Sequence, residues 1–465
     1  MKKKFTATLA LALTLVLCVA FGGGCNPHLL NKDVPLEYEV NLYLDKNITE
    51  TLRIMVPSNL EAEKKYMEAL RNGFKEIYPN VTIEFDERTV SDEQYVTSVN
   101  SAIASGNVPD LFWTNTAYYY YLISKKAVIN LEPYYTVAGA CSDDKRLDLE
   151  ADYYKSFFDM STYDGRRYIV PRSMDSVITF VNTELLAAAG IDFETDERLT
   201  NDWTWDDCIS VSREVAAWVQ SPAGQASKFK SSYALEAELS WEAVYNAMML
   251  SYGVEVFDEN GNIAVDSEET KKLANDIRAL RAEGRVMSRT EASLFGGGNS
   301  AFVFSSAGPA NMAVNSLIAD NFDALPFPLI GENPKIGCGF VGYGISTTAE
   351  GVKRDLAWAF LHYMISQEGQ MTLINGGLAT PSIRVDLAEE KQWSKGFQDL
   401  NLDAWLVHGD KKVATNFFMA KEPSCANELL TSVQSFMKDV CDSTSISVDM
   451  CVKRFVERIE EAIAQ

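Results

Sequence analysis

The stretch that decides the fold runs from Tyr163 to Ala189 and reads YDGRRYIVPRSMDSVITFVNTELLAAA. It begins with Asp164-Gly165, a turn signal, and continues through a β-type run that ends at Pro171. A second apolar run, Val177 to Val181, leads into Asn182 and a helical pattern. Two β-type runs separated by PRSMD predict a chain that leaves one sheet and enters another. We therefore predict a hinge between two lobes, with a ligand bound between them.

The chain before this stretch predicts a parallel sheet. Residues 52–57 form a β-type run that ends at a proline, apolar residues then recur at helical spacing, and residues 81–85 alternate as a second strand. A strand–helix–strand order is the signature of a parallel sheet. A short buried strand follows at 108–115, and its carboxyl end carries Trp113 and Asn115. Ligands of open α/β sheets bind outside the carboxyl ends of strands, so both residues are candidate ligand contacts.

The second half of the chain adds further strand ends. Residues 301–304 predict a buried strand that ends at Ser305-Ser306, and residues 340–346 predict a strand that glycines loosen. A helical pattern begins near Trp241. These patterns complete the expectation of an α/β protein.

Composition limits the classes of partner. The chain has 465 residues, 47% of them hydrophobic, which predicts the core of two or three domains. Its net charge is −23 and its pI about 4.6. An acidic surface argues against binding nucleic acid or anionic lipid through a basic face.

The N-terminus predicts export. Lys2-Lys3-Lys4 precedes an apolar run from Ala7 to Phe21, and small residues then lead to Cys25. This pattern is typical of a bacterial lipobox, so we predict a signal peptide over 1–24, lipidation of Cys25 and a tether over 25–50. Ordinary cleavage nearby is the alternative. No other run approaches the about 18 apolar residues that span a bilayer. The expected location is the outer face of the cell membrane, held by lipid.

The residues for catalysis or metal binding are sparse. Six cysteines remain beyond Cys18 and Cys25 without CxxC spacing, which disfavours zinc; export permits disulfides, whose pairing stays open. The glycine of the acidic stretch 258–262 is in the wrong place for a calcium loop. The chain holds three histidines and no G-x-S-x-G, HExxH or phosphate-loop motif. We expect no catalytic residue, metal or cofactor, although a carboxylate pair for glycoside hydrolysis stays open.

A binding protein needs aromatic platforms and hydrogen-bonding groups near element ends. Carbohydrate rings stack their apolar faces on aromatic side chains, while carboxylates and amides bind their hydroxyls. Residues of these types at or beside predicted element ends are Trp113, Asn115, Asp175, Trp241 and Tyr343. Each has a purely structural alternative, because tryptophans are more often core residues than platforms.

Several segments resemble the extracellular solute-binding proteins of ABC importers, specifically the large sugar-binding group called family 1. In chain order these are Tyr95–Trp113, Asp164–Pro171, Phe180–Thr183 with Ala189–Ile191, Asp202–Asp206, Gly344–Ser346, Ala357–Leu361 and Gln367–Gln370. Two positions depart from the family pattern: Asp202 stands in place of proline, and Val181 in place of tyrosine.

The resemblance implies a type II periplasmic-binding-protein-like fold, with two lobes that close on ligand like a hinged trap. Each lobe would be a mixed sheet flanked by helices, and a three-segment hinge would join them near Arg172–Ser176, Phe295–Ser300 and Cys338–Gly344. The implied lobes are 51–172 with 298–340, and 173–297 with 341–465. By matched position, Ser58, Trp113, Asn115, Ser305 and Ser306 of the first lobe face Asp175, Trp241 and Tyr343 of the second.

The implied function is non-covalent capture of a carbohydrate, most naturally an oligosaccharide, by a monomer. The protein would deliver the sugar to a membrane permease whose energy comes from a separate ATPase, so no ATP site is expected. Two alternatives stay open. One is a secreted polysaccharide-degrading hydrolase, and the other is the same fold with a peptide or polyamine ligand.

Overall fold

The computed structural model describes residues 37–89, 92–237, 239, 241–288, 294–314, 316–414, 425–442 and 445–464. The predicted signal peptide and Cys25 lie outside the described residues. Among these residues, no helix has the length and apolarity that crossing a bilayer requires.

The first sheet combines the N-terminal strands with two strands from much later in the chain. Its order is β12 (Lys412–Ala414), β11 (Ile336–Ile345), β3 (Leu111–Asn115), β1 (Thr51–Pro57) and β2 (Thr82–Arg88), with β6 (Val170–Ser176) also paired to β11. The β1, β2 and β3 strands are parallel, as the strand–helix–strand pattern predicts, and β11 runs antiparallel to β3 and β6. The sheet is therefore mixed.

The second sheet is smaller. Its order is β10 (Phe322–Pro326), β7 (Ile178–Asn182), β9 (Ser300–Ser305) and β8 (Tyr233–Glu236). The central β7 is antiparallel to both neighbours, and β8 is parallel to β9. A separate hairpin of β4 (Thr162–Tyr163) and β5 (Arg166–Arg167) turns at Asp164 and Gly165, which both have positive φ. Positive φ at both central residues is what an Asp-Gly hairpin turn requires, so the predicted turn is confirmed.

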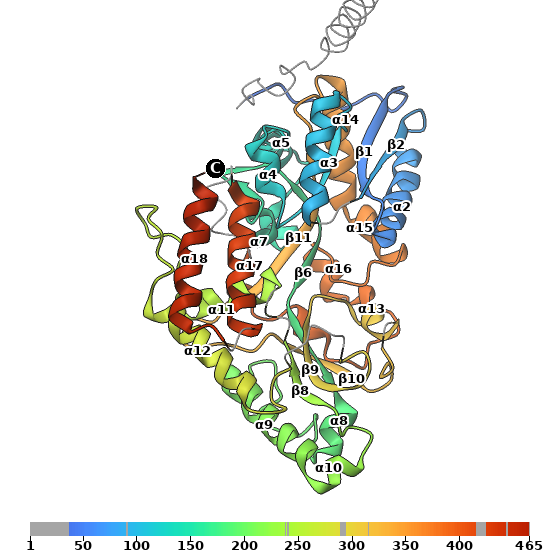
Figure 1. The fold of residues 1–465 in the computed structure, drawn as a ribbon. Helices are drawn as coiled ribbons and strands as arrows, with labels where there is room; N and C mark the ends of the chain where they lie inside the picture. Colours follow the sequence, from blue (N-terminus) through green and yellow to red (C-terminus); the bar gives the residue numbers. More distant parts are fainter. Residues whose placement is uncertain are drawn as a thin grey trace, which may run out of the picture.

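Helices flank both sheets (Figure 1). Those of the first lobe are α2 (Glu61–Ile77), α3 (Asp92–Ser105), α4 (Tyr119–Ser124), α5 (Glu132–Gly139), α6 (Leu149–Asp152), α7 (Lys155–Asp159), α14 (Val352–Ile365), α15 (Gln367–Asn375) and α16 (Val385–Glu389). Those of the second lobe are α8 (Thr183–Ala188), α9 (Trp205–Gln220), α10 (Pro222–Ala226), α11 (Glu242–Ser251), α12 (Glu268–Ala282), α13 (Pro309–Val314) and the short 3₁₀ turns η1 (Gln392–Ser394), η2 (Leu402–Trp405) and η3 (Gly409–Lys411).

The C-terminal helices form a hairpin of α17 (Ala426–Asp442) and α18 (Val448–Ile463), which packs beside α12 and contacts α11 and α4 (Figure 1). Helix α9 begins where the sequence predicts. Thr204 and Asp207 form a reciprocal capping box at its N-terminus, which satisfies two otherwise unpaired backbone N–H groups.

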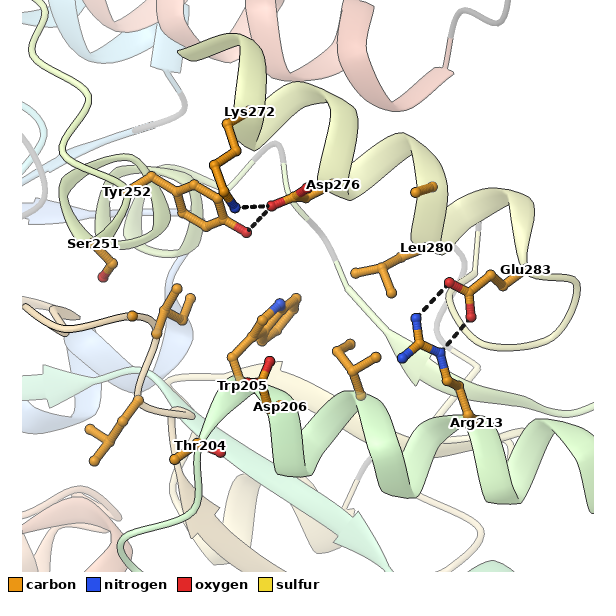
Figure 2. A pocket seen from close by; sticks show the side chains of 15 residues that line it. Thr204, Trp205, Asp206, Arg213, Ser251, Tyr252, Lys272, Asp276, Leu280 and Glu283 are labelled. Carbon is orange, nitrogen blue, oxygen red and sulfur yellow. Dashed lines mark hydrogen bonds and ion pairs between the residues drawn. The ribbon is translucent and has the colours of Figure 1, made fainter. Parts of the chain in front are cut away.

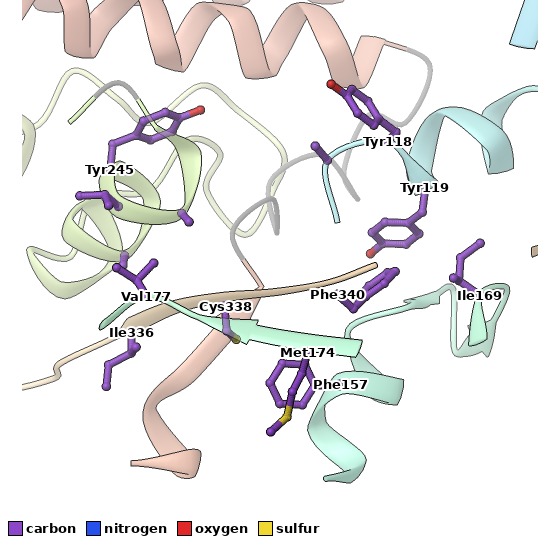
Figure 3. Packing of buried hydrophobic residues seen from close by; sticks show 14 of the residues in the cluster. Tyr118, Tyr119, Phe157, Ile169, Met174, Val177, Tyr245, Ile336, Cys338 and Phe340 are labelled. Atoms are coloured by element: carbon purple, nitrogen blue, oxygen red, sulfur yellow. The ribbon is translucent and has the colours of Figure 1, made fainter. Parts of the chain in front are cut away.

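The chain crosses between the sheets at Val177. Strand β6 ends at Ser176 in the first sheet and β7 begins at Ile178 in the second, so the crossing lies one residue beyond the predicted segment Arg172–Ser176. The predicted break, PRSMD, is itself part of β6. The Val177 backbone N–H donates to the Gly337 carbonyl at 2.8 Å. Figure 3 shows the apolar side chains around this crossing, with Met174 of β6 and Phe340 of β11 among them. The apolar core is therefore continuous from the first sheet to the second at this crossing.

The later lobe boundaries differ from the prediction. We assigned 298–340 to the first lobe, but β9 and β10 pair with β7 in the second sheet. The segment 295–300 therefore leads into β9 rather than between lobes. The return to the first sheet occurs over 327–335, before β11 begins. These strands belong together because Phe180, Phe322 and Trp405 pack into one apolar cluster on the second sheet.

The strand that contains Tyr343 also belongs to a different lobe from the one we predicted. We placed residues from 341 onward in the second lobe, whereas β11 pairs with β3 and β6 in the first. Its glycines permit this pairing, because a Cβ on Gly342 would lie 2.5 Å from the Val170 carbonyl oxygen. Among the described residues after β11, η1 and η2 pack against the second sheet before β12 returns to the first. The α17–α18 hairpin packs on α11 and α12 of the second lobe.

The described part of the predicted tether is not free. The Tyr38 hydroxyl donates to the Asn130 carbonyl at 2.6 Å, and the Arg354 guanidinium lies 4.1 Å from the centre of the Tyr38 ring. Leu42 is buried in the core. Residues from 37 onward therefore pack on the first lobe, which limits any tether to the chain before them.

Candidate functional site

A cleft lies where the two sheets meet, beside the Val177 crossing. Its walls come from the end of β3, the β6–β7 crossing, the start of α11, the residue after β9 and the middle of β11. The residues that line it are Asn115, Thr116, Ala117, Asp175, Val177, Trp241, Glu242, Ala243, Ser306 and Gly337–Val341. Its volume is about 90 Å³. Four predicted site residues therefore meet here: Asn115, Asp175, Trp241 and Ser306.

Asp175 lies in β6, two residues before the crossing. It lies opposite Gly339 of β11 in the strand register. A side chain at residue 339 would place its Cβ 2.6 Å from Thr116 Oγ1 and 3.0 Å from Asp175 Oδ1, so glycine leaves room for the carboxylate. Burial raises the pKa of Asp175 to about 6, and the Gly339 backbone N–H opposes that shift. At neutral pH the group is an ionised acceptor in a partly desolvated position.

A raised pKa in the folded state has a consequence for stability. Between the ordinary Asp pKa of 3.8 and about 6, the folded protein holds more protons than the unfolded chain, so stability falls as pH rises through this window. We expect Asp175→Asn to raise the free energy of unfolding at pH 7.5 by about 1–2 kcal/mol and to change it little at pH 4. Urea denaturation at the two pH values measures this. An equal effect at both pH values would contradict the raised pKa of Asp175 as the cause.

Asn115 and Thr116 fix the first-lobe wall. Asn115 Oδ1 accepts from the Ala117 N–H at 2.9 Å, which orients the amide, and its Nδ2 has no hydrogen-bond partner among the described residues. Thr116 Oγ1 accepts from the Phe340 N–H at 2.8 Å and ties the end of β3 to β11. The sequence pattern at the strand end indicated Asn115 but gave no sign of Thr116.

Trp241 and Glu242 form the second-lobe wall. Trp241 is the N-cap residue of α11 and is half-buried, and Glu242 stands in the first turn. The start of α11 packs tightly on β11, because a Cβ on Gly337 would lie 1.8 Å from the Ala243 carbonyl oxygen. The backbone at the start of α11 therefore lies against β11. Glu242 had no sequence signal of its own.

Two of the serines that we predicted as ligand contacts lie outside the cleft. Ser58 is exposed after β1, and its hydroxyl lies 3.1 Å from Thr89 Oγ1. Ser305 Oγ accepts from the Ala307 N–H at 3.1 Å, which stabilises the turn that contains Ser306. Neither lines the cleft.

Trp113 and Tyr343 are core residues in this structure. Trp113 is 2% exposed and lies 6.0 Å, centre to centre, from the Tyr95 ring of α3. Tyr343 is fully buried, and its hydroxyl donates to Glu63 Oε1 of α2 at 2.8 Å. Because helices cover the face of the sheet on which these rings lie, neither ring is open to a ligand. We therefore leave both out of the site proposed below.

A buried ion pair underlies the start of the hinge. Arg172 donates to Glu63 through Nη2 at 2.7 Å and through Nε at 3.1 Å. The Gln370 amide donates to the Arg172 carbonyl at 3.0 Å, which connects α15 to the same strand. This network ties β6, β11, α2 and α15 together, and nothing in the local sequence pattern indicated it.

Metal ligands are not grouped anywhere in the described residues. The cysteines of this part of the chain are free thiols. His362 is buried in α14 with a lowered pKa because of desolvation, and the His408 ring lies 2.6 Å from the Asn201 carbonyl. Neither histidine lines the cleft.

Comparisons with known proteins agree with this architecture. The family model of the bacterial extracellular solute-binding protein matches residues 57–371. The GacH receptor of Streptomyces glaucescens GLA.O, solved unliganded and with acarbose, matches with TM-score 0.66 and 18% identity over 90% of this chain and 100% of that chain. An ABC substrate-binding protein from Listeria monocytogenes, in complex with cycloalternan, matches with TM-score 0.65 and 16% identity over 90% and 100%.

A third solved structure widens the range of ligands. UgpB from Mycobacterium tuberculosis, in complex with glycerophosphocholine, matches with TM-score 0.69 and 15% identity over 89% of this chain and 98% of that chain. No curated protein sequence matches significantly. The fold is of the type II periplasmic-binding-protein-like kind.

Proposed function

Because the chain belongs to the bacterial extracellular solute-binding proteins, we propose that it captures a carbohydrate between its lobes and delivers it to an ABC importer. The observation that carries the proposal is the meeting of an aromatic platform, Trp241, with the polar groups of Asp175 and Asn115 at the crossing between the sheets. An indole stacks on the apolar face of a sugar, and carboxylate and amide groups bind its hydroxyls.

The charge of the cleft favours a neutral ligand over a phosphate. Its lining includes the carboxylates of Asp175 and Glu242 and, among the described residues, no lysine or arginine. A phosphate needs cationic partners, so a phosphodiester such as the UgpB ligand fits this lining poorly. A polyamine is the second candidate, because two carboxylates also suit a cation.

Binding requires the lobes to separate. The cleft measures about 90 Å³, whereas sites for small ligands measure about 300–1,000 Å³. The segments that join the sheets, Val177 and 327–335, are the places where backbone rotation opens it. Ligand contacts to both walls then drive closure. No chemical step is part of this function.

The test is calorimetry with a panel that contains maltose, maltotetraose, cycloalternan, acarbose, tagatose, glycerophosphocholine and spermidine, followed by chromatography of each ligand. We expect a saccharide to bind and to be recovered intact. Cleavage of a glycan would support the hydrolase alternative instead. Binding of spermidine with no saccharide bound would contradict the carbohydrate proposal and favour the polyamine.

The proposed location is the outer face of the membrane, with Cys25 as the lipidated residue. We expect Cys25→Ala to move the protein from the membrane fraction to the soluble extracytoplasmic fraction, because a lipid supplies the anchor. Fractionation followed by mass spectrometry of the N-terminal peptide measures this, and Cys18→Ala is the matched control. Retention of Cys25→Ala in the membrane would contradict this anchor.

A further inference from the structure

A second, larger cavity lies in the second lobe, away from the cleft. It opens between α9, the end of α11, α12 and the 329–331 segment, and its volume is about 800 Å³ (Figure 2). That size lies within the range of small-ligand sites. None of its lining residues is shared with the cleft.

Trp205 supplies an aromatic wall that is held in place. It is the first residue of α9, directly after the N-cap Thr204, and its backbone N–H donates to the Leu329 carbonyl at 2.9 Å. Its ring also packs near Phe304 of β9, at 6.4 Å between centres. Figure 2 shows the indole between the two charged clusters of the cavity, with Tyr252 on the opposite wall.

Apart from Asp206, the charged side chains of the cavity are already paired. Arg213 contacts Glu283 through two bonds of 2.6 and 2.7 Å, which join α9 to α12 (Figure 2). At the other end, Asp276 accepts from Lys272 at 2.6 Å and from the Tyr252 hydroxyl at 3.1 Å. Pairing neutralises the charges but leaves donors on the guanidinium and lone pairs on the carboxylates. These two pairs therefore offer hydrogen bonds rather than net charge.

The remaining lining divides into an apolar part and one further acceptor. Ile209, Leu280 and Ile330 contribute apolar surface. Asp206, exposed in the first turn of α9, adds a carboxylate that disfavours an anionic ligand. Apolar and aromatic surface beside neutral hydrogen-bonding groups matches a saccharide, whose ring has an apolar face and a rim of hydroxyls.

We propose that this cavity is a second saccharide site, separate from the cleft, with a sugar ring against Trp205 and its hydroxyls on Asp206 and Asp276. Its ligand class rests on the proposed function; its place and lining do not. With both sites occupied, one protein molecule binds two molecules of sugar.

The position of α11 decides where test substitutions belong. Its start lines the cleft, and its last residue, Ser251, lines the second cavity and accepts from the Lys335 N–H at 2.9 Å. A change on α11 would disturb both sites. We therefore choose Ala279 on α12, which is exposed and lines only the second cavity, and Ala279→Trp to fill it. Asn275→Trp is the matched control, because Asn275 is exposed on the same helix outside the cavity.

The experiment is calorimetric titration of the full chain with maltose, maltotetraose, cycloalternan, acarbose and tagatose up to millimolar concentration. We expect two equivalents of at least one sugar for the wild type and Asn275→Trp, and one equivalent for Ala279→Trp. Asp206→Ala, which removes an exposed carboxylate and leaves the packing intact, should weaken the second equivalent at least fivefold.

The outcomes separate this site from the cleft. No binding of any sugar, or a stoichiometry that Ala279→Trp leaves unchanged for every bound sugar, would overturn the inference. If Trp241→Ala leaves all binding unchanged while Ala279→Trp removes it, the proposed cleft is contradicted and this site stands.

Discussion

Glu63→Leu should lower the free energy of unfolding by about 3–5 kcal/mol, the largest effect expected of any single substitution considered for this protein. The Glu63 and Arg172 side chains are 5% and 4% exposed, so the substitution leaves a buried guanidinium without its counter-charge. Arg172 Nη1 already has no hydrogen-bond partner among the described residues, and Tyr343 also loses its acceptor. Urea denaturation followed by circular dichroism measures the change.

Two controls isolate the buried charge as the cause. The double variant Glu63→Leu with Arg172→Met should recover much of the loss, because replacing both partners by apolar side chains removes the uncompensated ion. Glu457→Leu breaks an exposed pair with Lys453 and should change stability by less than about 1 kcal/mol. If Glu63→Leu costs no more than Glu457→Leu, the ion pair does not hold the base of the hinge.

The crossing between the sheets was predictable to within one residue because its signal is local. Two β-type runs lie within a few residues, and the structure places β6 and β7 in different sheets, although the proline-containing segment between the runs belongs to β6. The partners of β11 were not predictable in this way. They are β3 and β6, far back in the chain, and the pattern of one strand does not state which distant strand it joins.

The candidate site was likewise predictable where the signal is local and not where it depends on distant parts of the chain. Asn115, Asp175, Trp241 and Ser306 stand at or beside element ends, and the cleft collects all four. Trp113 and Tyr343 have the same residue chemistry but are covered by α3 and α2, whose placement depends on tertiary packing. Likewise, the four tyrosines at 118–121 are all buried, and α17 contacts α4 across about three hundred residues of sequence. Burial that depends on distant elements produces no pattern in the local sequence.

Trp241→Ala should weaken binding of the carbohydrate by about 1–3 kcal/mol if the indole stacks on the sugar ring. The residue suits this role because it caps α11, which holds its backbone, and its half-buried side chain lines the cleft. Calorimetry with the saccharide identified from the panel measures the loss. Trp218→Ala is the matched control, since Trp218 is also half-buried in the second lobe but lines neither cavity. Equal affinities for both variants would contradict the cleft as the carbohydrate site, because the platform on its second-lobe wall would then contribute no more than a tryptophan remote from the ligand.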